Sequence, residues 1–268
     1  MKNKNYSREH LAYLKKLKKN KILVILSRCL ILVAILGFWE LFAYLKIVDP
    51  FITSSPSRVI ATIGSLYENG TLFYHIGITL GETIAGFVIA VVFGYGVAIV
   101  LWSSETVRKV LEPYIVVLNS LPKIALGPLI IIWIGTGYSA IIFMTVLVSV
   151  IVCIMNTLAG FAAVDETKML LMKAMGAGKL TTLKKLIVPA SLPALMNTLK
   201  VAVGLAWIGS IMGEYIVSKA GLGYLIVYGG QVFRLDLVMT ATFILCVLAG
   251  GMYGIIALIE KRVCKNFD

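Results

Sequence analysis

The chain has 268 residues, of which 59% are hydrophobic and only 14% are charged, and its mean hydropathy is +0.94. Soluble domains carry about 25% charged residues, so this composition excludes a soluble α/β domain, which would have to bury more apolar surface than a chain of this length can cover. The sequence therefore predicts an all-α membrane protein, and its net charge of +12 is concentrated in a few segments.

The N-terminal arm, residues 1–22, carries much of this charge. Its one acidic residue is Glu9, and its basic residues are Lys2, Lys4, Arg8, Lys15, Lys16, Lys18, Lys19 and Lys21. A basic arm can bind nucleic acid, but this one runs directly into an apolar segment. The positive-inside rule and attraction to anionic lipid explain the charge more simply. We therefore expect a cytoplasmic arm that contacts membrane lipid and no nucleic acid.

Apolar stretches long enough to cross a membrane follow, since a spanning helix needs about 20 apolar residues. The predicted spans are residues 23–45, 75–102, 110–134, 138–162, 194–217 and 237–259. Pro122 and Pro128 are expected to break the third span, because proline removes a backbone donor and kinks a helix. Gly135 and Gly137 predict a turn after it. The segments between the other spans, 46–74 and 218–236, are expected to be loops.

The basic segments fall on one side of this arrangement. Six crossings place both termini, the short link 103–109 and the loop of about residues 165–189 on the same side, and the nearly neutral loops on the other. Cytoplasmic segments of membrane proteins carry an excess of Lys and Arg. We therefore expect a transmembrane domain of residues 23–260, a cytoplasmic tail of residues 261–268, and both termini in the cytoplasm.

The loop of residues 165–189 contains the segment GAGKLTTLKK, which does not form a phosphate-binding loop. That motif needs G-x-x-x-x-G-K-[ST] after a strand, and Lys173 and Leu180 occupy its first glycine position and its hydroxyl position. We therefore expect no ATP site in this chain.

The same loop is expected to form two short helices. Met169–Met175 is amphipathic and favours a helix, and Gly176 and Gly178 allow a sharp turn. Residues 179–188 then lead back, and Pro189 and Pro193 are expected to mark the return to the membrane.

This loop resembles the cytoplasmic coupling loop of binding-protein-dependent ABC importer permeases, whose signature is E-A-A, three residues, G, nine residues, then I-x-L-P. Gly176 matches the glycine, 186–189 the tail, and 170–172 the E-A-A position, where the glutamate is absent. The resemblance implies that the loop contacts an ATPase through a largely apolar surface. The implied coupling residues are Leu170, Leu171, Met172, Ala174, Met175, Gly176, Ala177, Gly178 and Pro189.

The resemblance extends over about residues 30–260 and is to the nitrate, sulfonate and taurine subgroup. It rests on the blocks DPFITSSPSRV (Asp49–Val59), HIGITLGETIAGF (His75–Phe87), SLPKIALGPLIIIWIGTG (Ser120–Gly137) and GLAWIGSIMGEYIVSKAGLGYLI (Gly204–Ile226). In the second block the subgroup carries a basic residue at the position of Glu82, a departure compatible with a different solute.

What the resemblance implies is a type I ABC importer permease of about six spans in the inner or plasma membrane of a bacterium. Its implied partners are a second permease copy, two ABC ATPase subunits that carry ATP and Mg²⁺, and an extracytoplasmic substrate-binding protein. This chain itself would hold no cofactor and would not be an enzyme. The implied solute is a small anion such as a sulfonate, taurine or nitrate, and the alternative is a vitamin precursor such as a thiamine pyrimidine.

Polar residues inside the predicted spans are costly and invite a functional interpretation. The candidates for a solute pathway are Asn119, Ser120, Lys123, Asn156 and Glu214. Lys123 either lines the pathway and attracts an anion, or extends outwards or pairs with a carboxylate. Asparagine and serine often join helices by hydrogen bonds instead, and Glu214 is equally compatible with a structural role at a helix end or an external gate.

Two other function classes predict different behaviour. A stand-alone carrier or channel driven by an ion gradient would transport without any ATPase. A membrane enzyme would bring several convergent polar groups together, whereas His10 and His75 are isolated and the four cysteines show no metal-binding spacing. We therefore expect no catalytic and no metal site.

Overall fold

A computed structural model describes residues 8–47 and 49–265, and these residues form helices and turns without a strand. The chain divides into two compact units, residues 1–62 and 63–268. The first seven residues of the predicted arm, Lys2 and Lys4 among them, and the last three residues of the predicted tail lie outside the described residues.

The first unit begins with α1 (Arg8–Tyr44), a single helix that continues through the predicted end of the basic arm. The short helix α2 (Pro50–Thr53) and then α3 (Pro56–Glu68) follow. Glu40 on α1 accepts hydrogen bonds from the backbone N (3.0 Å) and the Oγ (2.8 Å) of Ser57 near the start of α3. The prediction of a plain loop over residues 46–74 is therefore wrong, since α3 is a helix of 13 residues.

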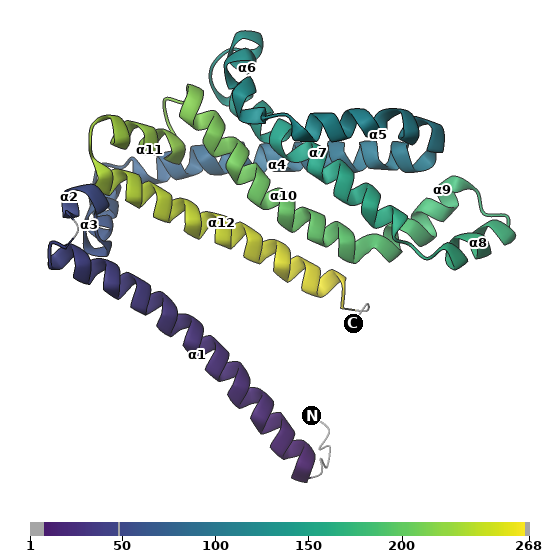
Figure 1. The fold of residues 1–268 in the computed structure, drawn as a ribbon, viewed down its shortest axis with the longest axis horizontal. Coiled ribbons are helices and arrows are strands. Elements are labelled where there is room, and N and C mark those ends of the chain that lie inside the picture. The colour runs from purple at the N-terminus through teal and green to yellow at the C-terminus, as the bar shows by residue number, and fades with distance from the viewer. Residues whose placement is uncertain (1–7, 48, 266–268) are drawn as a thin grey trace. The chain divides into compact units, whose positions relative to one another are not determined.

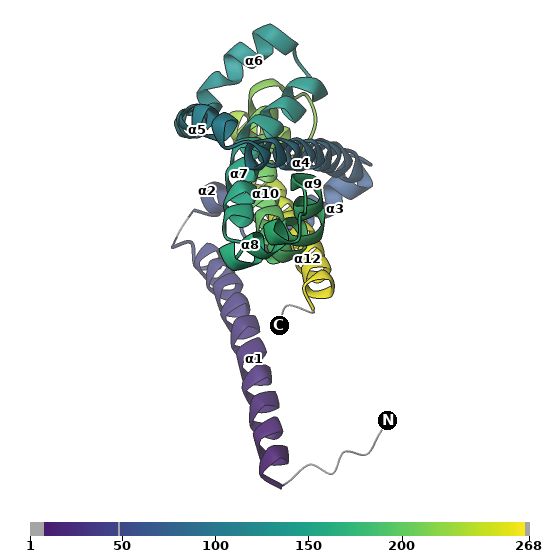
Figure 2. The same cartoon turned by 90° about the vertical axis from the view of Figure 1, so that its right-hand side faces the viewer.

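The second unit contains the remaining helices, which Figures 1 and 2 show in two views. They are α4 (Leu72–Ser103), α5 (Glu105–Ser120), the 3₁₀ turn η1 (Lys123–Leu126), α6 (Gly127–Ile134), α7 (Tyr138–Ala162), α8 (Glu166–Ala174), α9 (Lys179–Thr182), the π-turn η2 (Leu183–Ile187), α10 (Val188–Val217), α11 (Leu222–Gln231) and α12 (Leu235–Val263).

The centre of this unit is the packing of α4, α7 and α10 (Figures 1 and 2). Small residues allow the close approach: a Cβ atom on Gly209 of α10 would lie 2.6 Å from the Cα of Thr145 on α7. The buried hydroxyls of Thr83 on α4 and Ser210 on α10 lie 2.7 Å apart and share a hydrogen bond. Small residues and hydroxyl bonds of this kind drive helix association in lipid, where the hydrophobic effect offers little.

The number of membrane spans agrees with the sequence. Among the described residues, five helices are long and apolar enough to cross a membrane, and α5 with η1–α6 makes a sixth if this bent pair counts as one span. The predicted all-α fold with about six spans is confirmed, and α7 has the predicted bounds, Tyr138–Ala162.

The third span is broken at Leu121 and Pro122, where the helix axis turns by 84°. The predicted break at Pro122 is confirmed, but the predicted break at Pro128 is wrong. Pro128 lies in the first turn of α6, where a missing backbone N–H needs no partner. The link 103–109 is also shorter than expected, because α5 begins at Glu105 and the Oγ of Ser104 accepts from Val107 N at 3.4 Å.

The fifth span differs from its prediction in a similar way. The span was expected to begin at residue 194, after Pro189 and Pro193, but helix continues through both prolines from Lys179 to Val217. The π-turn η2 precedes these prolines, and Val188 N bonds there to Leu183 O, five residues back. A π-turn shifts the backbone hydrogen bonds by one residue. This shift helps the helix to continue through prolines, which lack a backbone N–H donor.

The expected loop of residues 218–236 contains a further helix, α11, so the prediction of a loop is wrong there. Leu222 and Leu225 of α11 are buried in the main apolar cluster with α10 and α12. Burial of this face outweighs the low helix propensity of its glycines.

Candidate functional site

The loop predicted to couple to an ATPase is built around α8, at the opposite end of the second unit from α11 (Figure 1). Asp165 caps its start: one carboxylate oxygen accepts from Thr167 N at 2.8 Å. This backbone hydrogen bond lowers the pKa of the Asp165 carboxyl below its usual value, so the cap stays ionised at neutral pH.

The end of α8 is a Schellman turn. Gly176 adopts a left-handed φ of +73°, its N–H donates to Lys173 O at 3.0 Å, and Ala177 N–H donates to Met172 O at 3.0 Å. Glycine is favoured at this position because a Cβ atom strains a left-handed backbone. Gly178 has an ordinary φ of −70° and instead precedes α9 as its N-cap, so only Gly176 has the conformation that was expected of both.

The free surface of α8 and the residue after it includes large apolar side chains. Leu170, Leu171 and Met175 expose 67%, 59% and 73% of their surfaces, Ala174 is also exposed, and Met172 is half-buried. Large apolar side chains gathered on an exposed helix outside the spans are typical of a surface that contacts another protein.

Contacts with the rest of the second unit hold this loop in place. Lys179 Nζ donates to Ser103 O at the end of α4 (2.9 Å). Leu183 and Ile187 of η2 are buried against Phe161 of α7. A cleft of about 640 Å³ remains between the end of α4 and the α8–α9 turn. Pro189 lies in the first turn of α10 and is half-buried, so it is not one of the exposed residues of α8.

The candidate pathway residues are brought together only in part. Lys123 Nζ donates to both the backbone O and the Oδ1 of Asn119, each at 3.4 Å, across the break in the third span. Ser120 donates to Val116 O at 3.1 Å, within α5. Asn156 is half-buried on α7, and no hydrogen bond joins it or Glu214 to the Asn119–Lys123 group within the described part of the chain.

Glu214 lies near the end of α10 and contacts the start of α11. It is 1% exposed, and its Oε2 accepts from the backbone N of Gly223 (2.6 Å) and Tyr224 (3.3 Å). The first N–H groups of a helix carry partial positive charge and lack internal partners, so the carboxylate satisfies them. The nearby Gly221 N–H donates to His75 Nδ1 at 3.0 Å.

One pair of charged residues within the spans was not predicted from the sequence. Lys200 of α10 and Glu260 of α12 form an ion pair in which both side chains are mostly buried. Their separation of 60 positions in the sequence gives no local signal. Because each charge neutralises the other, the pair has a structural role: it joins α10 to α12.

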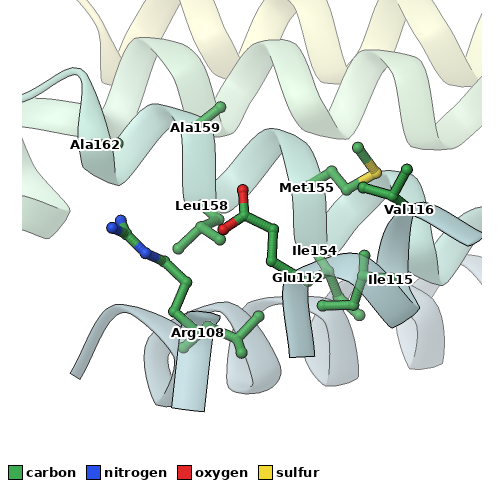
Figure 3. Close-up of a pocket in the computed structure, with 10 residues that line it drawn as sticks. Arg108, Glu112, Ile115, Val116, Ile154, Met155, Leu158, Ala159 and Ala162 are labelled. Atoms are coloured by element: carbon green, nitrogen blue, oxygen red, sulfur yellow. The ribbon is translucent and has the colours of Figure 1, made fainter. Parts of the chain in front are cut away.

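A mostly apolar cleft of about 210 Å³ lies between α5 and α7 (Figure 3). Ile115 of α5 and Met155 of α7 line its walls, and Arg108 and Glu112 of α5 extend toward α7. The Nε of Arg108 is buried and has no hydrogen-bond partner among the described residues. None of the candidate pathway residues lines this cleft.

The described residues hold no group of three or more His, Cys, Asp or Glu side chains placed to bind a metal ion.

Comparison with known proteins identifies the family of this chain. The signature of the binding-protein-dependent transport system inner membrane component matches residues 86–265. This chain belongs to that family of permeases. The match begins within α4 and extends to the end of α12, so it contains α8, the broken third span and Glu214.

Two relatives show the range of the family around this permease. The taurine transport system permease protein TauC of Escherichia coli is 26% identical over 81% of this chain and 81% of its own length. The formylaminopyrimidine transport permease protein ThiX of Halalkalibacterium halodurans is 29% identical over 74% of this chain and 79% of its own length.

A solved structure supports the same fold. The MetNI methionine ABC transporter, in an inward-facing crystal form, contains a chain that superposes with a TM-score of 0.66 at 18% identity, over 73% of this permease and 97% of that chain. The permease is therefore an ABC-type, multi-pass inner-membrane protein of binding-protein-dependent transport.

Proposed function

We propose that this permease forms the membrane pathway of an ATP-driven importer, in which α8 is the contact for a separate ATPase subunit. The exposed apolar surface of Leu170, Leu171 and Met175 carries the proposal. An apolar helix of this kind can lie in a groove of a partner, and its attachment to α4 and α7 would transmit the partner's movement to the spans.

The complete importer would contain two copies of the permease, two ATPase subunits holding ATP and Mg²⁺, and an external protein that delivers the solute. Closure of the ATPases on ATP would move α8, and the spans would rock about the break at Pro122. Such rocking would open the pathway alternately to the outside and the inside. Lys123 and Asn119 lie at this break, and in the proposed pathway a passing anion would meet the positive charge of Lys123.

The solute we propose is a small sulfonate, taurine or nitrate-like anion, on the likeness to TauC. The likeness to ThiX favours a second candidate, a thiamine-type pyrimidine. In either case the importer would take up solute from outside, with the α8 end of the permease in the cytoplasm.

Reconstitution tests the proposal. The permease is placed in liposomes with its candidate ATPase, and uptake of labelled taurine, ethanesulfonate, nitrate and formylaminopyrimidine is measured with the candidate binding protein outside. We expect uptake of one of them that needs both ATP and the binding protein. Uptake by the permease alone, driven by an ion gradient, would instead establish a stand-alone carrier.

A further inference from the structure

Two buried carboxyl groups meet where α4 packs against α10. Glu82 of α4 is 2% exposed and Glu214 of α10 is 1% exposed, and a hydrogen bond joins their side chains. An ionised carboxylate only accepts hydrogen bonds, whereas a protonated carboxyl also has an O–H donor. The bond between these two groups therefore requires that one of them holds a proton.

The other contacts of the pair do not supply this hydrogen. The Oε2 of Glu214 accepts from two backbone N–H groups at the start of α11. The buried Oε2 of Glu82 and Oε1 of Glu214 accept from no N–H or hydroxyl group in the described part of the chain. Thr79 is close to Glu214, but its single hydroxyl hydrogen is donated to His75 O at 3.2 Å. A proton shared between the two carboxyls satisfies both oxygens at once.

The surroundings compensate one negative charge and not two. The titratable groups near the pair are Tyr74 and His75 of α4, Tyr138 of α7, Tyr215 of α10, Lys219 after it, and Tyr224 of α11. The Nδ1 of His75 accepts from Gly221 N–H at 3.0 Å, so this nitrogen carries no proton. Lys219 is exposed and forms no ion pair with Glu82 within the described residues.

The start of α11 is left as the partner of the pair. A helix N-terminus carries about half of a positive charge, which suits a pair of carboxyls with a single negative charge. Two ionised carboxylates in hydrogen-bonding contact would repel each other, and burial removes the water that screens this repulsion. Two acidic groups in such contact bind a proton as a unit rather than separately.

A cleft gives the pair access to water. Its volume is about 260 Å³, and it is lined by Glu82, by the first turns of α4, by the turn between α6 and α7, and by the residues after α10. Tyr138, Ser218 and Lys219 make part of its wall polar. A polar cavity of this size is large enough to hold water molecules, which can deliver a proton to Glu82 or take it away.

We propose that Glu82 and Glu214 form a proton-binding site, in which one shared proton holds α4 to α10. Release of this proton to water in the cleft breaks the hydrogen bond between the carboxyls and leaves two negative charges that weaken the contact. Because Glu214 also holds the start of α11, three helices respond to the same proton. The inference goes beyond the proposed importer function and does not depend on the solute.

Infrared spectroscopy tests whether the proton is present, on the full-length permease in a detergent without carbonyl groups. Glutamates in water are ionised at neutral pH, so the carbonyl stretching band of a protonated carboxyl marks a proton that the fold retains. We expect this band in the wild type, and we expect it to shift in D₂O. Glu82→Gln and Glu214→Gln should each lose it, because the amide donates to the remaining carboxylate in place of the proton.

Thermal unfolding at several pH values tests what the proton does. The folded wild type holds one proton that the unfolded chain releases above about pH 5, so stability should fall as the pH rises from there. One linked proton changes the unfolding constant about tenfold per pH unit. The unfolding temperature of the wild type should therefore fall more steeply with pH than that of Glu82→Gln. His75 titrates in both proteins, so the comparison removes its contribution.

Glu68→Gln, which removes an exposed acidic group from the end of α3, is the matched control and should keep both the band and the pH dependence. If one amide variant does not fold, the other decides. If neither folds, Glu82→Asp, which keeps a carboxyl but shortens its reach, must shift the band. A wild type without the band, a band that persists in a folded amide variant, or equal pH dependence of the wild type and Glu82→Gln overturns the proposal.

Discussion

The turn after α8 depends on Gly176, whose φ of +73° few other residues adopt. We expect Gly176→Val to strain this turn by about 1–3 kcal/mol, enough to displace α8 in a large fraction of the molecules. ATP hydrolysis should continue while uptake falls about tenfold or more, since a factor of ten corresponds to about 1.4 kcal/mol. Uptake and ATPase activity of the same proteoliposomes give the measurement.

Gly178 provides the control for this variant. It lies two positions away, has a φ of −70°, and a Cβ atom there would meet nothing within 4 Å. Gly178→Ala should therefore couple like the wild type. Normal uptake by Gly176→Val would remove the coupling role from the turn.

The contacts of Glu214 predict an effect of its replacement on stability. Glu214→Ala leaves the N–H groups of Gly223 and Tyr224 without their acceptor at a buried site, which should lower the free energy of unfolding by about 1–3 kcal/mol. Thermal unfolding in detergent measures the change. Glu214→Gln keeps one acceptor oxygen and should lose less, and equal losses in the two variants would contradict this explanation.

Lys123 tests the proposed pathway. Its ammonium group bonds only to Asn119 in the described part of the chain, so it is available to attract an anion. Lys123→Met should raise the KM for an anionic solute about fivefold or more, and Lys123→Arg should keep most of the wild-type value because the charge remains. A Lys123→Met variant with an unchanged KM would assign the residue a structural role.

The sequence predicts the role of a residue best where the role depends on the local backbone conformation. The spacing of the loop indicated the turn at Gly176, but Gly178 is equally a glycine and adopts another conformation, because it already belongs to the start of α9. The acceptor role of Glu214 was open in the sequence, since its partners come from a helix that the sequence did not predict. The proximity of Glu82 to Glu214 depends on the packing of α4 against α10, so no local sequence signal predicts it.

Among the elements, the contact of α7 with α10 is the one that depends most on a small residue. A Cβ atom on Gly209 would meet the backbone of Thr145 at 2.6 Å. Gly209→Ala should therefore push these helices apart and lower the free energy of unfolding by about 1–3 kcal/mol. Gly204→Ala on the same helix, where a Cβ atom meets nothing within 4 Å, should leave thermal unfolding in detergent unchanged. Equal behaviour of the two variants would mean that the helices repack freely.

Elements were predictable from the sequence in proportion to their apolar length. The spans around α4, α7 and α12 follow from long apolar runs, and their ends differ from expectation by a few residues at most. The helices α3 and α11 were missed because prolines and glycines surround or interrupt them. Their stability comes from tertiary packing, which local propensity does not contain.

At the scale of the whole molecule, the distribution of basic residues and the proposed ATPase contact have to indicate the same orientation in the membrane. The apolar surface of α8 can reach an ATPase only if its end of the permease is cytoplasmic. Lys168 and Lys173 on α8 and the lysines that follow it are the charges that the positive-inside rule places there. The turn between α6 and α7, at the opposite end, holds no charged residue between Gly135 and Gly137.

Labelling of single cysteines tests this orientation. The free cysteines Cys29, Cys153, Cys246 and Cys264 are first replaced by serine. A membrane-impermeant maleimide applied to intact cells should then label Thr136→Cys in the exposed α6–α7 turn, and should label Lys173→Cys on α8 and Lys16→Cys on α1 only after the membrane is permeabilised. All of these sites are exposed in the structure, so access to the reagent depends on the membrane alone. Labelling of Lys173→Cys in intact cells would place α8 outside, where no ATP-driven partner could reach it, and both the coupling role and the importer would then have to be abandoned.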